Sequence, residues 1–310
     1  MMISSAFWGK ISDRFGRKRA LIISGIFLFF YGFLSTFAPS YGWILCLRFM
    51  VGFNIGCVPQ SVTLYAEFLP TKQRGKCVVL LDCFWAMGAC LEVVLAMLIM
   101  PTLGWRWLLA VSSIPSLMFV LASSWLPESA RFMAASGNSD QALDTLTRVA
   151  GDNGQSMLLG RLVVDDMTSL SRGRLADLLS KDLRRTTILL WIIWATASFS
   201  YYGVVLMSAE LFEDQNIGQL CSLNTDHGQT CSAQCHPLKT TDYNHLLWTT
   251  LAEFPGILVS LIMIEKIGRK KTMALEFLLF TITICFLFNC GASKNVTTAV
   301  LFMARALGET

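Results

Sequence analysis

Charged residues are scarce in this chain of 310 residues: they make up 15% of the sequence, against roughly 25% in soluble domains. Hydrophobic residues make up 54%. So few charged residues exclude an ordinary soluble domain. They are expected of a protein inside a lipid bilayer, because a charged side chain is costly there. Histidine is rarer still, with three residues, all between positions 227 and 245. No histidine lies in an apolar run and no phosphate-binding glycine loop occurs, so we expect neither an enzyme nor a bound cofactor.

Seven apolar runs are long enough to cross the roughly 30 Å hydrocarbon core, which needs about 20 helical residues. They lie near 20–38, 43–68, 77–100, 106–126, 187–209, 246–264 and 272–291. The sequence therefore predicts an all-α, polytopic membrane helix bundle. The first nine residues have neither a basic start nor a cleavage site, so we expect no cleavable signal peptide.

Basic residues are concentrated in alternate loops. The loops at 10–19, 70–76, 127–186 and 265–271 hold 20 of the 25 Lys and Arg residues, while the loops between them hold only Arg106, Lys239 and Lys294. Because basic residues flank the cytoplasmic ends of spans, these four loops and the N-terminus are predicted to be cytoplasmic. Bases dispersed in this way indicate a lipid bilayer, and no nucleic acid, as the partner.

Two of the basic loops share a pattern. Residues Asp13–Lys18 read acid, base, any residue, glycine and two bases, and residues Glu265–Lys270 repeat that order. Gly16 and Gly268 permit a sharp turn because glycine tolerates positive φ. The repeat predicts two pseudo-repeated halves.

The predicted domains are an N-terminal bundle (1–126), a cytoplasmic linker (127–186) and a C-terminal bundle (187–310) with an outer loop at 210–245. Within the linker, Asn138 or Ser139 is placed to begin an amphipathic helix that ends near Gly151 and Gly154. A second short helix is expected near 174–183. We interpret both as helices lying under the membrane domain.

The outer loop contains Cys221, Cys231 and Cys235 together with the three histidines. One disulfide and one spare thiol are expected in an oxidising compartment. The alternative is a zinc site that also uses His227 or His236. The spacing fits no established zinc pattern, so we favour the disulfide and predict no metal.

Five motifs carry a resemblance to the major facilitator superfamily. The loop Gly9–Arg19 is similar to the signature loop between that superfamily's second and third helices. Four stretches resemble its sugar-porter-like subgroup: Arg48–Gly56, Tyr65–Gly75, Gly104–Trp107 and Pro127–Phe132, the last with Ala130 where proline is common. The run Val58–Glu67 resembles the synaptic vesicle 2-related proteins, in particular the SVOP-like branch.

The resemblance implies a partial major facilitator fold. The family has twelve spans, and by this comparison the chain begins within the second and ends within the tenth. It would then be a shortened, alternative product of a longer transporter gene. Of the helices that line the family's cavity, only the fourth (43–68) and seventh (187–209) would be whole.

The implied function is secondary transport of a small organic ion or sugar-like solute by alternating access, with a proton or cation as a candidate coupling partner. The alternative is a transport-inactive membrane partner or regulator that forms an oligomer with a full-length relative. An integral, multi-pass membrane location is expected, with an intracellular vesicle as one candidate membrane.

The resemblance also places a cytoplasmic gate at the inner helix ends. In the family, the residue at Asp13 caps the eleventh helix, and the other charges form ion pairs while the carrier faces out. The alternative is a solvated, positively flanked surface. The candidate gate and signature-loop residues are Gly9, Asp13, Arg14, Gly16, Arg17, Lys18, Glu67, Arg74, Glu128, Arg131, Glu265, Gly268 and Arg269.

Ionisable residues inside the apolar runs are candidates for a substrate or proton path, because such groups usually face a bundle interior or water. Glu92 and Glu253 lie deepest. Each carboxylate has an alternative role as a group satisfied by a neighbouring helix, and aromatic residues in spans often face lipid. The candidates are Arg48, Asp82, Glu92, Glu253, Glu276 and Tyr202.

Overall fold

The structure is a computed structural model. It describes residues 2–157, 160, 178–213, 240–287 and 294–308. Within these residues every regular element is a helix, which confirms the expected all-α class. The tertiary contacts divide the chain into two compact units: the first comprises 1–78 and 99–177, and the second comprises 79–98 and 178–310.

The first unit is built from antiparallel helices followed by two shorter helices, α7 and α8. Their bounds are α1 Met2–Phe15, α2 Arg17–Leu34, α3 Tyr41–Ile55, α4 Val58–Phe68, α6 Trp105–Ala122, α7 Ala130–Ala135 and α8 Ser139–Asp152. Helices α3 and α4 form one span that is interrupted at Gly56 and Cys57, where Pro59 opens α4. Proline suits this place because the first turn of a helix needs no internal N–H donor.

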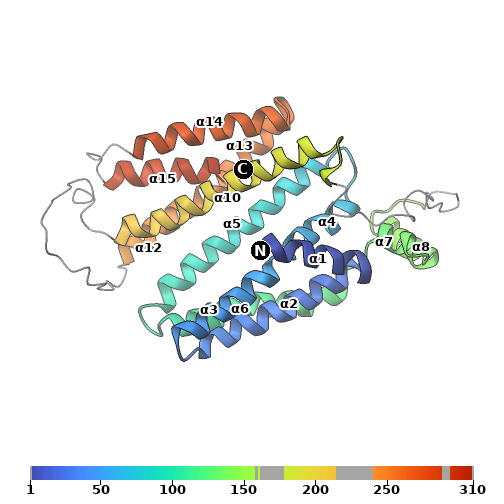
Figure 1. Cartoon of the computed structure of the whole chain (residues 1–310), viewed down its shortest axis with the longest axis horizontal. Helices are drawn as coiled ribbons and strands as arrows, with labels where there is room; N and C mark the ends of the chain where they lie inside the picture. The colour runs from blue at the N-terminus through green and yellow to red at the C-terminus, as the bar shows by residue number, and fades with distance from the viewer. Residues whose placement is uncertain (1, 158–159, 161–177, 214–239, 288–293, 309–310) are drawn as a thin grey trace, which may run out of the picture. The chain divides into compact units, whose positions relative to one another are not determined.

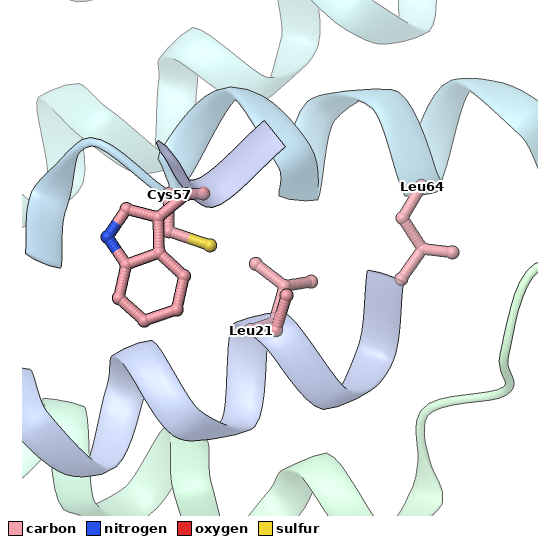
Figure 2. Close-up of a cluster of buried hydrophobic side chains, with 5 residues drawn as sticks. Leu21, Cys57 and Leu64 are labelled. Atoms are coloured by element: carbon pink, nitrogen blue, oxygen red, sulfur yellow. The ribbon is translucent and has the colours of Figure 1, made fainter. Parts of the chain in front are cut away.

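The core of the first unit lies between α1, α2 and the broken span. Trp8, Ala20, Leu21, Cys57 and Leu64 form one buried cluster, and Figure 2 shows Leu21 facing Cys57 and Leu64 across the two helices. The indole Nε1 of Trp8 donates to a backbone carbonyl of α3 at 3.0 Å. This contact satisfies the one polar group that Trp8 takes into the core.

The second unit contains α10 Arg184–Glu213, α12 Thr240–Leu251, α13 Glu253–Lys266, α14 Arg269–Leu287 and α15 Lys294–Gly308. Residues 79–98 of α5 (Arg74–Ile99) also belong to it. Helices α14 and α15 run side by side in Figure 1. Val204, Leu301 and Ala304 form the buried centre of this unit.

Six described helical spans are long and apolar enough to cross a membrane: 17–37, 41–68, 74–99, 105–125, 184–208 and 240–266. They match six of the seven predicted runs within a few residues. The seventh prediction, 272–291, falls on α14, which does not pass this test over its described residues, and positions 288–291 lie outside them. Large apolar side chains stay exposed along the spans, for example Phe199 at 82%, as a lipid-facing surface requires.

The linker prediction is met in its first half. Helix α8 begins after Asn138, carries Asp140 in its first turn and ends at Asp152, before Gly154 with φ 64°. Of the second helix expected near 174–183, residues 178–179 are 3-10 helical and 180–183 form a bend and turns that lead into α10, while 174–177 lie outside the described residues. Residues Cys221, Cys231 and Cys235 also lie outside them, so the disulfide and zinc alternatives remain predictions.

Candidate functional site

The charged residues of the first unit meet at the start of α2. Its first two N–H groups, from Arg17 and Lys18, donate to Oε1 of Glu128 at 3.0 and 3.1 Å, and the N–H of Ser129 donates to the same oxygen at 3.0 Å. The first N–H groups of a helix have no partner within it, and the helix dipole favours a negative charge there. Glu128 therefore caps α2 from a segment more than 100 residues away in sequence.

Gly16 makes this cap possible. It precedes α2 with φ 102°, a conformation that L side chains rarely adopt. A Cβ atom at this position would also overlap the carboxylate of Glu128. Gly268, in the repeated loop, has φ 89° but no neighbouring atom within 4 Å of such a Cβ. The two loops thus share a backbone turn, and in the first of them the carboxylate of Glu128 caps the helix that follows.

An ion pair lies beside the cap. Arg17 pairs with Glu67 at the end of α4, and their side chains are 18% and 14% exposed. The hydroxyl of Ser129 donates to the other Glu67 oxygen and accepts the N–H of Phe132 at 3.0 Å, which caps α7. Contacts among four residues therefore connect α2, α4 and α7. We call these residues the inner cluster: Arg17, Glu67, Glu128 and Ser129.

The remaining predicted gate residues surround this cluster to different degrees. Arg74 and Arg131 line a cavity of 490 Å³ together with Arg17 and Glu67, which leaves its wall net positive. Asp13 is exposed and makes no ion pair among the described residues. Arg17, in the same loop, is turned toward Glu67.

Four other loop residues lie outside the inner cluster. Arg14 lies over the ring of Phe15, 5.4 Å from its centroid. A Cβ on Gly9 would have only ordinary contact, 3.6 Å from Gln60. In the second unit, Glu265 lies at the end of α13 and Arg269 begins α14.

A second charged pair lies within the spans of the second unit. Glu253, fully buried, faces Arg305 of α15, with Oε1 and Nη2 3.4 Å apart. Nη1 of Arg305 donates to Thr250 Oγ1 at 2.8 Å and to Thr249 Oγ1 at 3.4 Å. Both hydroxyls donate in turn to the carbonyl of Leu246, so their oxygens are left to accept from the guanidinium. We call Glu253 and Arg305 the buried pair.

The backbone packing fixes the distance between the helices that carry the buried pair. Gly256 of α13 lies so close to α15 that a Cβ on it would overlap the carbonyl of Ala306. Small residues of this kind let helices in membranes approach closely. Glu253 is the central residue of the 27-residue candidate span 240–266, and its partner Arg305 lies in the last turn of α15.

The other span candidates are distributed unevenly. Asp82 and Tyr202 line one cavity of the second unit, where Glu276 joins them. Glu92 is exposed on α5 and Arg48 is exposed on α3. One turn along from Arg48, a Cβ added to Gly52 would meet no atom within 4 Å, whereas one added to Gly56 would overlap Ser4.

Two features of these sites were not predicted from the sequence: the pairing of Arg305 and the capping of α2. Arg305 had no predicted role, although a basic residue in an apolar run with an acidic residue in another is a signal for a pair. Glu128 was expected to act through ion pairs, whereas it caps a helix. Gly16 lies directly before the first residues of α2, Arg17 and Lys18. A glycine at that place was the available signal that the first N–H groups of the helix need a partner from elsewhere in the chain.

Comparisons with known proteins agree with this architecture. The model of the family "Sugar (and other) transporter" matches residues 1–225. The chain is 52% identical over 309 residues to the synaptic vesicle 2-related protein of Xenopus laevis, covering 99% of this chain and 55% of that protein. It is 37% identical to the putative transporter SVOPL of Homo sapiens, covering 99% of this chain and 63% of that protein.

The fold is also found among solved structures. A partially occluded, inward-open structure of the xylose transporter XylE from E. coli superposes with a TM-score of 0.61 at 18% identity, covering 99% of this chain and 68% of that one. At this identity the likeness concerns the fold alone. The chain spans about half the length of the synaptic vesicle 2-related proteins that it matches.

A bundle of membrane-spanning helices in two units, with a charged inner cluster and a repeated basic loop, defines a multi-pass membrane protein of the major facilitator type. The chain belongs to the sugar (and other) transporter family of this superfamily.

Proposed function

We propose that the protein is a secondary carrier that moves a small organic ion or sugar-like solute by alternating access. The observation that carries the proposal is family membership over 1–225, combined with a repeated basic loop in each half. Alternating access is rocking of two such repeats around a site near the middle of the membrane. Ionisable residues within the spans support a coupled proton or cation as part of the mechanism.

The inner cluster is proposed to act as the cytoplasmic gate. The side chains of its ion pair are 18% and 14% exposed, so the pair keeps some contact with solvent, and we take its contribution to be closer to the roughly 0–1 kcal/mol of surface pairs than to that of a fully buried pair. Contacts of this size can break and re-form in every cycle. The hydrogen bonds from the first N–H groups of α2 to Glu128 add a second contact to the proposed gate. This contact involves residues of the same inner cluster.

The membrane is proposed to be that of an intracellular vesicle. The support is the name of the relatives, synaptic vesicle 2-related proteins, which are about half identical to this chain. Epitope-tagged protein should then co-purify with vesicles and should be absent from surface biotinylation.

The decisive experiment is uptake into liposomes that contain the purified protein, using labelled organic cations, organic anions and sugars in parallel. We expect saturable uptake of at least one class. Glu67→Gln should change its rate, while the control Asp144→Asn, on the far exposed face of α8, should not. Absence of uptake for every class would contradict the carrier function. Co-purification with a full-length relative in that case would favour the alternative, a membrane partner.

A further inference from the structure

The second unit contains a cavity with a definite chemical character. Its volume is 390 Å³, within the range of about 300–1,000 Å³ that small-molecule sites occupy. Residues of α5, α10, α14 and α15 line it, including the carboxylates of Asp82 and Glu276. No Lys, Arg or His is among the described residues that line it. The cavity wall is therefore acidic.

Neither carboxylate has a countercharge in the described part of the chain. No ion pair to Asp82 or Glu276 occurs among the described residues. Glu276 is 6% exposed, and its Oε1 accepts the hydroxyl of Ser260 at 2.5 Å. This distance is typical of a hydroxyl that donates to a carboxylate. A buried acid with a hydrogen bond and no cation is an incomplete site.

Both acids lie at a similar depth. Asp82 is eight residues from the start of α5 and Glu276 is seven residues from the start of α14, so each lies roughly 10–12 Å along its helix from the basic end. A single ligand of modest size in the cavity can therefore lie near both.

Aromatic rings form much of the remaining wall. The indole Nε1 of Trp85 donates to Oη of Tyr201 at 3.1 Å. Tyr201 in turn packs edge-on against Tyr202, with ring centroids 5.3 Å apart. Trp85, Trp194 and Tyr202 line the cavity with 49%, 71% and 45% of their surface exposed. Exposed faces of Trp and Tyr attract cations, above all quaternary ammonium groups.

The buried arginine of this unit does not change the acidic character of the cavity. Arg305 is held by Glu253 at 3.4 Å, so the buried pair is neutral as a unit. An anionic ligand would meet two uncompensated carboxylates in the cavity and no free cation on its wall. A cation gains from both the acids and the rings.

We propose that this cavity binds a monovalent organic cation, in which an ammonium or quaternary nitrogen lies near Asp82 and Glu276 and against the aromatic rings. As a statement about the transported solute, this inference rests on the proposed function. Binding itself is independent of transport and can be measured alone.

The probe is tritiated benzyltrimethylammonium, measured by scintillation proximity on the purified full chain in nanodiscs. We expect saturable binding that unlabelled benzyltrimethylammonium displaces and that its neutral isostere, neopentylbenzene, does not. Asp82→Asn and Glu276→Gln should each weaken binding about tenfold or more, because each removes a charge from a partly desolvated site. Asp82→Lys should abolish it.

The control is Asp242→Asn, which removes a carboxylate of the same unit outside the cavity and should bind as the parent does. Size-exclusion profiles and thermal unfolding identify folded variants. Asp82 is exposed on its helix, so its variants should fold even if Glu276→Gln does not. Equal displacement by neopentylbenzene, or unchanged binding by folded Asp82→Asn, would overturn the proposal. Displacement by sodium alone would also overturn it.

A liposome experiment separates this inference from the proposed function. Binding of the probe without uptake of any solute class supports the cavity assignment and contradicts transport. Saturable uptake of a sugar with no binding of the probe supports transport and overturns the cation site.

Discussion

The inner cluster and the buried pair use the same chemistry, a glutamate against an arginine, in different surroundings. Arg17 and Glu67 lie at helix ends with 18% and 14% of their side chains exposed. Glu253 lies in the middle of the span 240–266 and Arg305 in the last turn of α15, with 0% and 7% of their side chains exposed. Removing one partner of the buried pair leaves a charge that water cannot solvate, whereas water can partly replace a lost partner in the Arg17–Glu67 pair, which keeps some contact with solvent. The first arrangement suits a contact that opens, and the second suits one that holds helices together.

The largest effect should come from breaking the buried pair. Arg305→Met leaves Glu253 as an uncompensated charge among packed helices, and we expect a loss of about 3–5 kcal/mol in unfolding free energy. Denaturant titration of the purified protein in detergent measures it. Combining Arg305→Met with Glu253→Leu should recover most of the loss, because no charge is then buried. A double variant as unstable as the single one would contradict this reading.

The cap on α2 can be tested by a pair of equivalent glycines. Gly16→Ala and Gly268→Ala both force alanine into positive φ, at a cost of about 1–3 kcal/mol. Only Gly16→Ala also displaces the carboxylate of Glu128, which should add about 1–2 kcal/mol through lost hydrogen bonds. Thermal unfolding of the two variants gives the difference. Equal losses would show that Glu128 contributes little to the inner cluster.

The close packing beside the buried pair has its own matched control. Gly256→Ala places a methyl group against the carbonyl of Ala306 and should cost about 1–3 kcal/mol. Gly52→Ala lies in a helix with open space around it and should be neutral or stabilising by up to about 1 kcal/mol. Both are read from denaturant titration. If Gly256→Ala is as well tolerated as Gly52→Ala, the two helices do not need their close approach.

The smallest effect on stability should come from Glu67→Gln. Its ion pair with Arg17 is partly solvated, so we expect a change of about 1 kcal/mol or less, which shrinks further in high salt. Unfolding titrations at low and high ionic strength measure both quantities. A loss of several kcal/mol, insensitive to salt, would make the inner cluster a structural element and weaken its proposed role as a gate.

Much of the fold follows from the sequence because the bilayer imposes simple rules. Apolar runs of about 20 residues located six of the spans, and the repeated loop at 13–18 and 265–270 indicated two halves. The interruption of the span 41–68 at Gly56 and Cys57 was not predicted. Within one apolar run, the sequence does not distinguish a proline that begins a new helix, as Pro59 does, from a proline inside a continuous helix. Helix α14 was expected to end at 291, and it is described to Leu287.

The sites were less predictable because they depend on which helices are neighbours. Glu67, Glu128 and Arg17 were named as candidates, and the structure brings all three together. The partner of Glu253 was not foreseen, because 52 residues separate it from Arg305 in sequence. Asp82 and Glu276 were both named, but nothing in their spacing indicated that one cavity contains them.

The energy that couples each pair is the most direct test of the difference between the two regions. Two double-mutant cycles, Arg17→Gln with Glu67→Gln and Arg305→Met with Glu253→Leu, give both coupling energies from unfolding titrations of the same protein. We predict about 1 kcal/mol or less for the first pair and about 3 kcal/mol or more for the second. Equal values, or a larger value for the inner cluster, would contradict the assignment of one pair to opening and the other to holding the helices.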